Sequence, residues 1–188
     1  MREYGVSESC IVTLVRYQPR TFMMIPDAFK KIVDEVKRMG FDPSKLKFGL
    51  AVFAFRAMSR STWDKKVDVY KKWGLSEEEV FEAFGRTPWF MMASENKIMA
   101  MMDFFVNKMG WEYSFIVKRP ALITLSLKRI VPRGTLFQFL LSKGLLKENL
   151  YIPSFFEAPE KLFRKKFVDC FIEEAPEVLK LYPSNFSS

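Results

Sequence analysis

Five glycines recur along this chain at nearly constant spacing. Gly5, Gly40, Gly74, Gly110 and Gly144 are separated by 35, 34, 36 and 34 residues, and they account for five of the eight glycines. A period of this length is typical of solenoid proteins, in which no repeat can bury its apolar face alone and neighbours stack into one continuous core. The chain is therefore predicted to contain about five repeats of 34 to 36 residues.

The apolar residues between these glycines follow a helical period. Residues 27–40 and 94–110 each place their apolar side chains on one helix face. Both segments end at a phased glycine, which can adopt the left-handed conformation that closes a helix. Ser94 is a suitable N-cap, and Pro26 suits a first helical turn. Each repeat is thus expected to begin with an amphipathic helix.

A second, shorter apolar pattern follows each glycine and runs toward a proline, as at Pro88 and Pro120. Proline disfavours helical backbone at the residue before it, so the second helix should end there. The predicted unit is therefore helix, glycine turn, helix and proline. The second unit lacks a proline near residue 54. Pro153 and Pro159 interrupt the fifth unit, as expected for a terminal repeat that caps the stack.

No strand pattern competes with this interpretation. The apolar run 121–127 follows a repeat proline, which favours a short helical or irregular connection. Residues 1–188 are predicted to form one all-α solenoid domain of either hand. Because only four residues precede Gly5, the first unit lacks its first helix. We therefore expect the chain to start in mid-repeat, as the C-terminal part of a longer protein.

The positive charge of the chain is unevenly spread. Of the formal net charge of +8, residues 1–72 contribute 15 basic and 8 acidic side chains, whereas residues 73–188 contribute 15 and 14. Such a basic surface attracts polyanions, namely nucleic acid or an anionic membrane, although lysine also serves solubility alone. No apolar run approaches the length of a bilayer span, and no membrane partner is expected.

The residues that support most catalytic and metal sites are scarce. The chain has no histidine and two distant cysteines, Cys10 and Cys170, which predict buried thiols rather than a disulfide or a zinc cluster. No glycine-rich phosphate loop is present. The acidic cluster 77–79 lies at a predicted helix start, where negative charge favours the helix dipole. No catalytic residue, metal or cofactor is predicted.

Three stretches carry a specific resemblance: 110–126 (GWEYSFIVKRPALITLS), 125–146 (LSLKRIVPRGTLFQFLLSKGLL) and 160–182 (EKLFRKKFVDCFIEEAPEVLKLY). They resemble the C-terminal repeats of the mitochondrial transcription termination factor (mTERF) family, most closely the large set found in land plants. The resemblance is strong from about residue 61 onward and looser before it. Tetratricopeptide and pentatricopeptide repeats have similar periods, but they lack the second helix that stops at proline.

The resemblance implies a left-handed superhelix whose repeats have two helices and a short third helical turn. It also implies binding to nucleic acid in a mitochondrion or chloroplast. We expect the protein to be a monomer that contacts the phosphates of double-stranded DNA or structured RNA. Other organellar proteins are further possible partners. The implied roles are transcription termination or initiation, group II intron splicing and ribosomal RNA maturation.

The candidate contact residues are basic side chains at recurring positions in the repeats. A stripe along the first helices repeats at equivalent offsets from the phased glycines, and stacking would align it into rows that follow a phosphate backbone. Arginines near the prolines suit bidentate phosphate contacts. The stripe comprises Lys30, Lys31, Lys37, Arg38, Lys65, Lys66, Lys71 and Lys72, and it thins to Lys97 and Lys108 in the third unit. The other arginine candidates are Arg16, Arg20, Arg56, Arg60, Arg86, Arg119, Arg129 and Arg133.

Each of these residues has a structural alternative. Long basic side chains commonly occupy the solvated face of amphipathic helices. Arg133 follows Pro132 and could instead pair with an acidic neighbour. Four tryptophans could stack on bases, but packing between repeats is the favoured interpretation. For the whole protein, the alternative is a helical-repeat scaffold that binds a partner peptide or helix.

Overall fold

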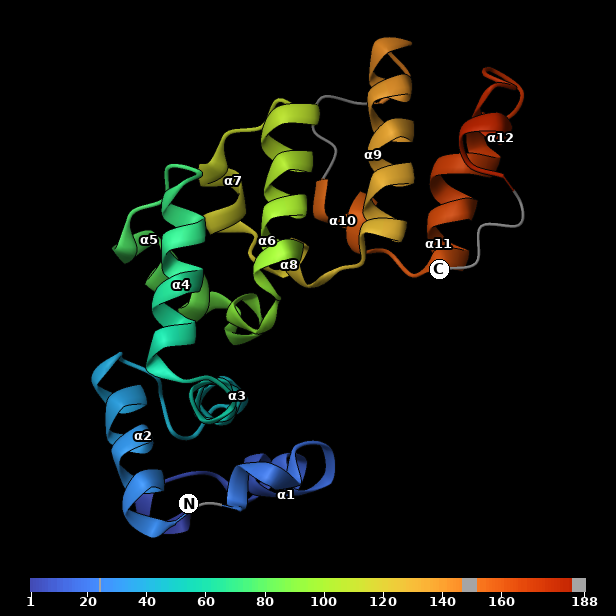
Figure 1. The fold of residues 1–188 in the computed structure, drawn as a ribbon. Coiled ribbons are helices and arrows are strands. Elements are labelled where there is room, and N and C mark those ends of the chain that lie inside the picture. The colour runs from blue at the N-terminus through green and yellow to red at the C-terminus, as the bar shows by residue number, and fades with distance from the viewer. Residues whose placement is uncertain (24, 147–151, 184–188) are drawn as a thin grey trace. The chain divides into compact units, whose positions relative to one another are not determined.

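The structure is a computed structural model that describes residues 1–23, 25–146 and 152–183. All regular elements in these ranges are helical, and the described residues contain no strand, which confirms the predicted fold class (Figure 1). The chain packs as two compact units, one of residues 1–99 with 116–124 and the other of residues 100–115 with 125–188. The number of repeats, their handedness and the single continuous domain stay predictions.

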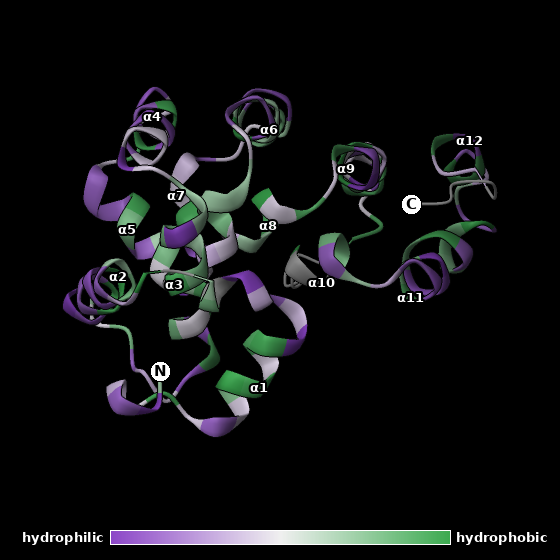
Figure 2. Cartoon of the chain, turned by 60° about the horizontal axis from the view of Figure 1, so that its bottom comes forward, coloured by the Kyte–Doolittle hydropathy of each residue, from purple (hydrophilic) through white to green (hydrophobic). Residues whose placement is uncertain are grey.

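Unit 1 is built around the buried helix α3 (Leu46–Ala57). Its helices are α1 (Glu8–Tyr17), α2 (Pro26–Arg38), α3 (Leu46–Ala57), α4 (Arg60–Lys71), α5 (Glu77–Arg86), the first residues of α6 (Glu95–Met102), the end of α7 (Tyr113–Lys118) and α8 (Ala121–Thr124), with 3₁₀ turns at Arg2–Tyr4, Pro19–Phe22 and Pro88–Met92. Hydrophilic and hydrophobic residues lie on opposite sides of α2 (Figure 2), where Val33 and Val36 are buried. By contrast, α3 buries Phe48, Ala51 and Val52, and it packs against α1 and α2.

Unit 2 has an aromatic core. It contains the end of α6, a π-helical continuation at Asp103–Lys108, the start of α7, α9 (Leu127–Ser142), α10 (Ile152–Glu157), α11 (Glu160–Phe163), a π-helical segment at Arg164–Val168, a 3₁₀ turn at Asp169–Phe171 and α12 (Val178–Leu181). The ring of Trp111 stacks on Phe105 at 5.3 Å and meets Phe156 edge-on at 5.5 Å. Phe155 in turn packs against Phe163 at 5.0 Å.

The phased glycines close helices as predicted. All five have positive φ, between 67° and 98°, whereas no other described residue does. At Gly40 the backbone N–H bonds to Lys37 O at 2.9 Å, and Phe41 N–H bonds to Val36 O at 3.4 Å, the pair of bonds that defines a Schellman motif. Gly144 repeats this pattern. The glycine period therefore reflects a backbone conformation that disfavours residues with a Cβ.

The prolines end helices as predicted. The first helix, α1, ends at Tyr17, two residues before Pro19, and α7 likewise ends at Lys118, before Pro120. The run after Pro120 forms α8, which confirms a short helical connection. Pro132 differs, because it lies inside α9 rather than at a helix boundary. There it cannot donate a backbone hydrogen bond, and Ser126 still caps the helix by accepting from Arg129 N–H at 3.3 Å.

Gly40→Ala should destabilise the protein by about 1 kcal/mol, because an L side chain in the left-handed region is strained. A Cβ at Gly40 would meet no atom within 4 Å, so the cost is conformational rather than steric. Thermal melting followed by circular dichroism measures the effect. Gly40→Asn is the matched variant and should recover part of the loss, since Asn tolerates this conformation. A Gly40→Ala protein as stable as the original would contradict the left-handed conformation assigned to Gly40.

Candidate nucleic-acid interface

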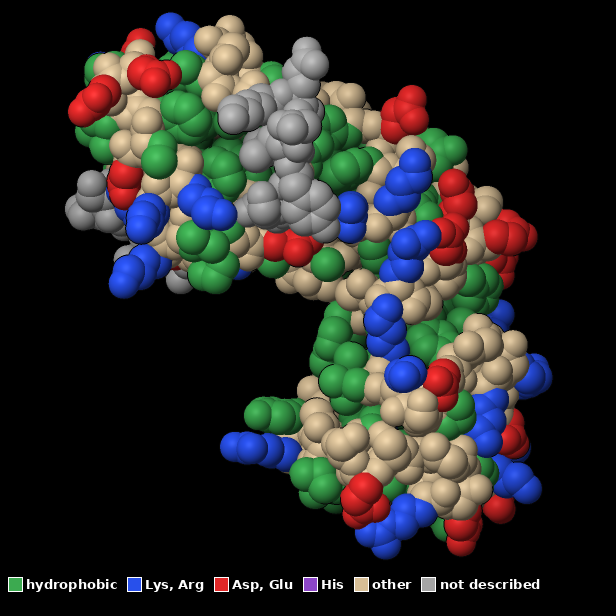
Figure 3. All heavy atoms as spheres, turned by 180° about the vertical axis from the view of Figure 1, so that it is seen from behind, with side chains coloured by type: hydrophobic (Ala, Val, Ile, Leu, Met, Phe, Trp, Pro, Cys, Tyr) green, Lys and Arg blue, Asp and Glu red, His purple; other side chains and the backbone are tan. Residues whose placement is uncertain are grey.

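The predicted contact residues separate into three groups according to what their charged ends contact. The first group is engaged inside the protein, the second is paired with surface carboxylates, and the third has no carboxylate partner. Figure 3 shows the mixture on one face, where Lys and Arg side chains are interspersed with Asp and Glu. The third group contains the strongest candidates for phosphate binding, because its charges are not already compensated.

Two lysines of the predicted stripe bind backbone carbonyls within unit 1. Lys66 is 7% exposed, and its Nζ donates to Met91 O at 2.8 Å. Half-buried Lys97 donates from Nζ to Thr124 O at 2.8 Å. Burial lowers the pKa of both ammonium groups, an effect that Glu95 opposes at Lys66. Each lysine thus ties the first helix of a repeat to the helical turn that follows the proline.

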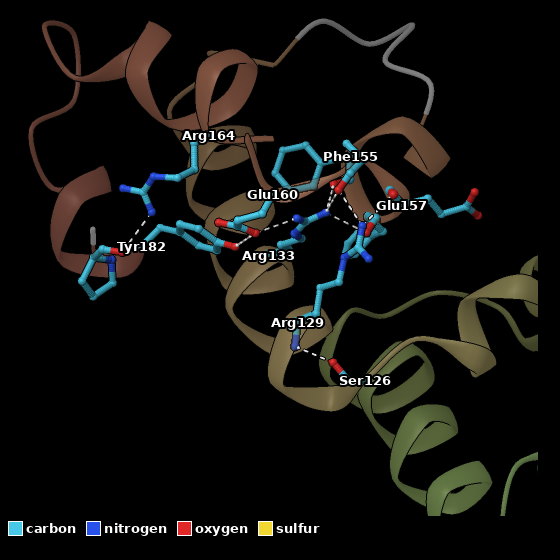
Figure 4. A network of polar contacts seen from close by, with 11 residues as sticks. Ser126, Arg129, Arg133, Phe155, Glu157, Glu160, Arg164 and Tyr182 are labelled. Carbon is cyan, nitrogen blue, oxygen red and sulfur yellow. Dashed lines mark hydrogen bonds and ion pairs between the residues drawn. The ribbon is translucent and has the colours of Figure 1, made fainter. Parts of the chain in front are cut away.

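Arg129 and Arg133 likewise bind backbone carbonyls, in unit 2 (Figure 4). Arg129 Nη2 donates to Glu157 O at 2.6 Å and to Ala158 O at 2.5 Å. Arg133 Nη1 donates to Phe155 O, Phe156 O and Ala158 O at 3.3, 2.9 and 2.8 Å. These carbonyls lie at the end of α10, where the last turn of a helix has no intrahelical donors. Two arginines one helical turn apart therefore cap α10 in front of Pro159.

Arg133 has no exposed surface, so its assignment as a phosphate contact is corrected. Its Nη2 forms an ion pair with Glu160 Oε2 at 2.9 Å, and its guanidinium lies 4.0 Å from the centre of the Phe163 ring. Tyr182 Oη donates to the same carboxylate oxygen at 2.9 Å. Arg133 therefore pairs with an acidic neighbour, which is the structural alternative given for it from the sequence. Arg129 is half-buried, and burial, followed by the charge of Arg133, lowers its pKa.

Arg60 and Arg86 belong to the second group. Arg60 Nε lies 3.0 Å from Asp64 Oδ1, and Arg86 Nη2 lies 2.6 Å from Glu82 Oε1, both across one helical turn. Exposed pairs of this kind contribute only about 0.2–1 kcal/mol, so a phosphate could displace the carboxylate. A phosphate would nevertheless have to displace a carboxylate before it could bind either arginine. Arg119 is half-buried and already interacts within the chain.

The third group includes the exposed lysines of α2 and α4. Lys30 and Lys37 are seven residues apart on α2, and Lys65 and Lys72 are seven apart at α4, so each pair shares a helix face. None of the four forms an ion pair with a carboxylate of the described residues, although Lys37 Nζ lies 5.5 Å from the centre of the Tyr4 ring. These four residues are called the lysine stripe below.

Two of the remaining arginines, Arg20 and Arg56, line a hollow of about 450 Å³ in unit 1. Its lining contains two arginines and no acidic residue: Tyr17, Gln18, Pro19, Arg20, Phe53, Arg56 and Ala57. We call it the arginine hollow. Arg20 is exposed, whereas Arg56 is half-buried, and its buried Nε has no hydrogen-bond partner in the described part of the chain. The guanidinium of Arg16 lies 5.4 Å from the centre of the Tyr17 ring.

The arginine hollow brings together segments that are far apart in sequence. Residues 17–20 end α1 and enter the following 3₁₀ turn, while residues 53–57 form the last turns of α3. A close approach of these helices is possible because Gly49 on α3 lies against Leu14 and Cys10 of α1. Arg20 and Arg56 were predicted as contact residues from their positions in the repeats, whereas Tyr17 and Phe53 were not. Tyr17 directly follows Arg16 in the sequence, and an aromatic residue next to an arginine was the signal that could have indicated this site.

Three of the four tryptophans, Trp63, Trp89 and Trp111, pack against aromatic residues of their own units. Trp63 is buried and stacks on Phe55 at 4.8 Å, and Trp89 packs against Phe53 at 5.5 Å. Among the described residues, no group of three or more His, Cys, Asp or Glu could hold a metal ion. No helix in the same part of the chain is both long and apolar enough to cross a membrane.

The family model for mTERF matches residues 54–164, more than half of the chain. The chain belongs to the mTERF family. The match runs from the end of α3 through the aromatic core of unit 2 to Arg164, and it includes the arginine cap on α10. No curated protein matches the chain. mTERF proteins are organellar, bind nucleic acid and are not enzymes, which agrees with the predicted class.

Proposed function

We propose that this mTERF protein regulates gene expression in a mitochondrion or chloroplast by binding DNA or RNA through backbone phosphates. Transcription termination or initiation and group II intron splicing are the roles that such binding serves. The observation that carries the proposal is the arginine hollow, because two arginines line it and no carboxylate does. The lysine stripe adds four exposed charges in the same unit.

The physical basis is counterion release. Each Lys or Arg that contacts a phosphate displaces a condensed cation, so affinity falls as salt rises. Arg133 is fully buried, and Arg129 Nη2 and Arg133 Nη1 already donate to backbone carbonyls, so neither side chain should add to this term. Binding should therefore depend on a limited set of side chains in unit 1. A scaffold that binds a protein partner would show no comparable salt dependence with nucleic acid.

Fluorescence anisotropy with labelled duplex DNA, single-stranded DNA and a structured RNA at several salt concentrations tests the proposal. For the polymer bound most tightly, we expect log K to fall linearly with log salt. Substituting all four lysine-stripe residues by Gln should reduce the slope by about 3, given about 0.9 per phosphate contact on a duplex and about 0.7 on a single strand.

The matched control removes the same charge elsewhere. Lys128, Lys143, Lys161 and Lys180 are exposed residues of unit 2, and their combined substitution by Gln should change the slope by less than about 1. Equal losses in the two quadruple variants would show that net charge alone governs binding, which contradicts a defined surface. Weak, salt-insensitive binding of the original protein to every polymer would favour a protein partner instead.

A further inference from the structure

We propose that the arginine hollow binds one unpaired nucleotide, with its phosphate between Arg20 and Arg56 and its base against Tyr17. The inference rests on the proposed function and adds a preference for single-stranded over duplex nucleic acid. It is based on the composition of the lining, which combines cationic, aromatic and amide side chains around one hollow. Neither a lysine row nor an isolated arginine provides this combination.

The charges of the hollow are suited to a phosphate. Arg20 and Arg56 line it without a neighbouring carboxylate, and neither forms an ion pair within the described residues. The buried Nε of Arg56 has no hydrogen-bond partner there. That atom does not distinguish Arg56, because the Nε atoms of Arg129 and Arg133 are also buried without a partner. A phosphate in the hollow would instead accept hydrogen bonds from the two guanidinium groups that line it, and an anionic oxygen is the acceptor that best suits a guanidinium.

The aromatic side chains are suited to a base. Tyr17 is 66% exposed although it adjoins the hollow, and one side of its ring faces the Arg16 guanidinium. Phe53 lines the opposite segment, with its ring held 5.5 Å from Trp89. An exposed aromatic ring beside cations is the arrangement by which proteins bind single strands, since every base offers a π face.

The size and lining of the hollow favour an unpaired nucleotide. Its volume of about 450 Å³ lies within the range of about 300–1,000 Å³ that is typical of small-ligand pockets. A base inside a duplex is stacked on both faces and paired at its edge, so it cannot reach Tyr17. An unpaired base can enter, and the Gln18 amide in the lining offers both donors and acceptors to its edge.

The test compares a labelled 20-nucleotide single strand with the 20-base-pair duplex of the same sequence. Tyr17→Leu retains apolar volume but removes the aromatic face. We expect it to weaken single-strand binding by at least about fivefold, which corresponds to the lower end of one base–aromatic stacking contact, and to leave duplex binding within about twofold. Fluorescence of 2-aminopurine in the strand should be quenched by the original protein and less by Tyr17→Leu.

The arginines are tested by a charge-matched pair of variants. Arg20→Gln with Arg56→Gln should weaken single-strand binding about tenfold or more, because both phosphate ligands are lost. Arg2→Gln with Arg38→Gln removes two ion-paired arginines of the same unit and should change it less than threefold. Circular dichroism melting confirms that each variant is folded.

Three outcomes would overturn the inference. The first is equal affinity of the original protein for the single strand and the duplex, with salt-dependent binding to both, which leaves the proposed function intact. The second is an equal effect of Tyr17→Leu on both polymers, or no effect on either. The third is displacement of the single strand by a poly-glutamate peptide at equal charge, which would make the hollow a general anion site. By contrast, failure to bind any nucleic acid would refute the proposed function itself.

Discussion

Arg133→Met should lower the melting temperature by roughly 10 °C. Removing one partner of a buried ion pair typically costs about 3–5 kcal/mol, and 1 kcal/mol shifts the melting of a protein of this size by about 2–4 °C. Met has a similar length but no donor. The carbonyls of Phe155, Phe156 and Ala158 would lose a shared donor, and the Glu160 carboxylate would lose its counter-charge. Circular dichroism melting measures the shift.

Two control variants test whether the loss of stability depends on the buried position of Arg133 and on its guanidinium group. Arg86→Met removes an exposed, ion-paired arginine and should change stability by less than about 1 kcal/mol. Arg133→Lys keeps the charge but lacks the planar fork, so it should fall between the original protein and Arg133→Met. A Met variant that melts within about 2 °C of the original protein would show that the network contributes little to stability.

Gly134→Val is expected to destabilise the protein by about 3 kcal/mol. Gly134 lies inside α9, where even a Cβ would overlap the Phe104 ring and approach Met109 Sδ to 3.0 Å. Overpacking a closely packed core typically costs about 1–3 kcal/mol, and the two further methyl groups of Val place this site at the upper end. Urea unfolding measures the loss.

Gly85→Val is the matched control. Gly85 also lies inside a helix, α5, but a Cβ there meets no atom within 4 Å. Because Val has a better helix propensity than Gly, this substitution should be neutral or stabilising by a few tenths of a kcal/mol. Opposite signs at the two glycines would confirm that close helix packing, rather than backbone conformation, requires Gly134. Similar losses at both positions would contradict that explanation.

The local features of the fold could be predicted closely from sequence. The positive φ of Gly40 and Gly144, the helix start at Pro26 and the cap at Ser94 all agree with the structure. The Ser94 hydroxyl accepts from Lys97 N–H at 3.3 Å. Pro132 was less predictable, because a proline within an apolar pattern usually marks a helix boundary. Capping by Ser126 and packing of α9 outweigh that preference here.

The candidate site was only partly predictable. Periodicity correctly placed Lys30, Lys37, Lys65 and Lys72 on exposed helix faces. The same reasoning could not distinguish them from basic residues that face inward, such as Lys66. The arginine hollow was equally hidden, since its two halves are separated by more than thirty residues and meet only when α1 packs on α3.

Sequence alone determined the helical class, the glycine turns and the proline stops of this protein, because each depends on the backbone preferences of a few neighbouring residues. Only the tertiary structure decided which cations remain available to a polyanion. Arg133 is fully buried and donates to carbonyls 22 to 25 residues away, whereas Arg56 lines a hollow beside exposed Arg20. A guanidinium has the same charge in both places. Its role follows from the carbonyls, carboxylates and solvent around it, and packing alone brings those groups into position.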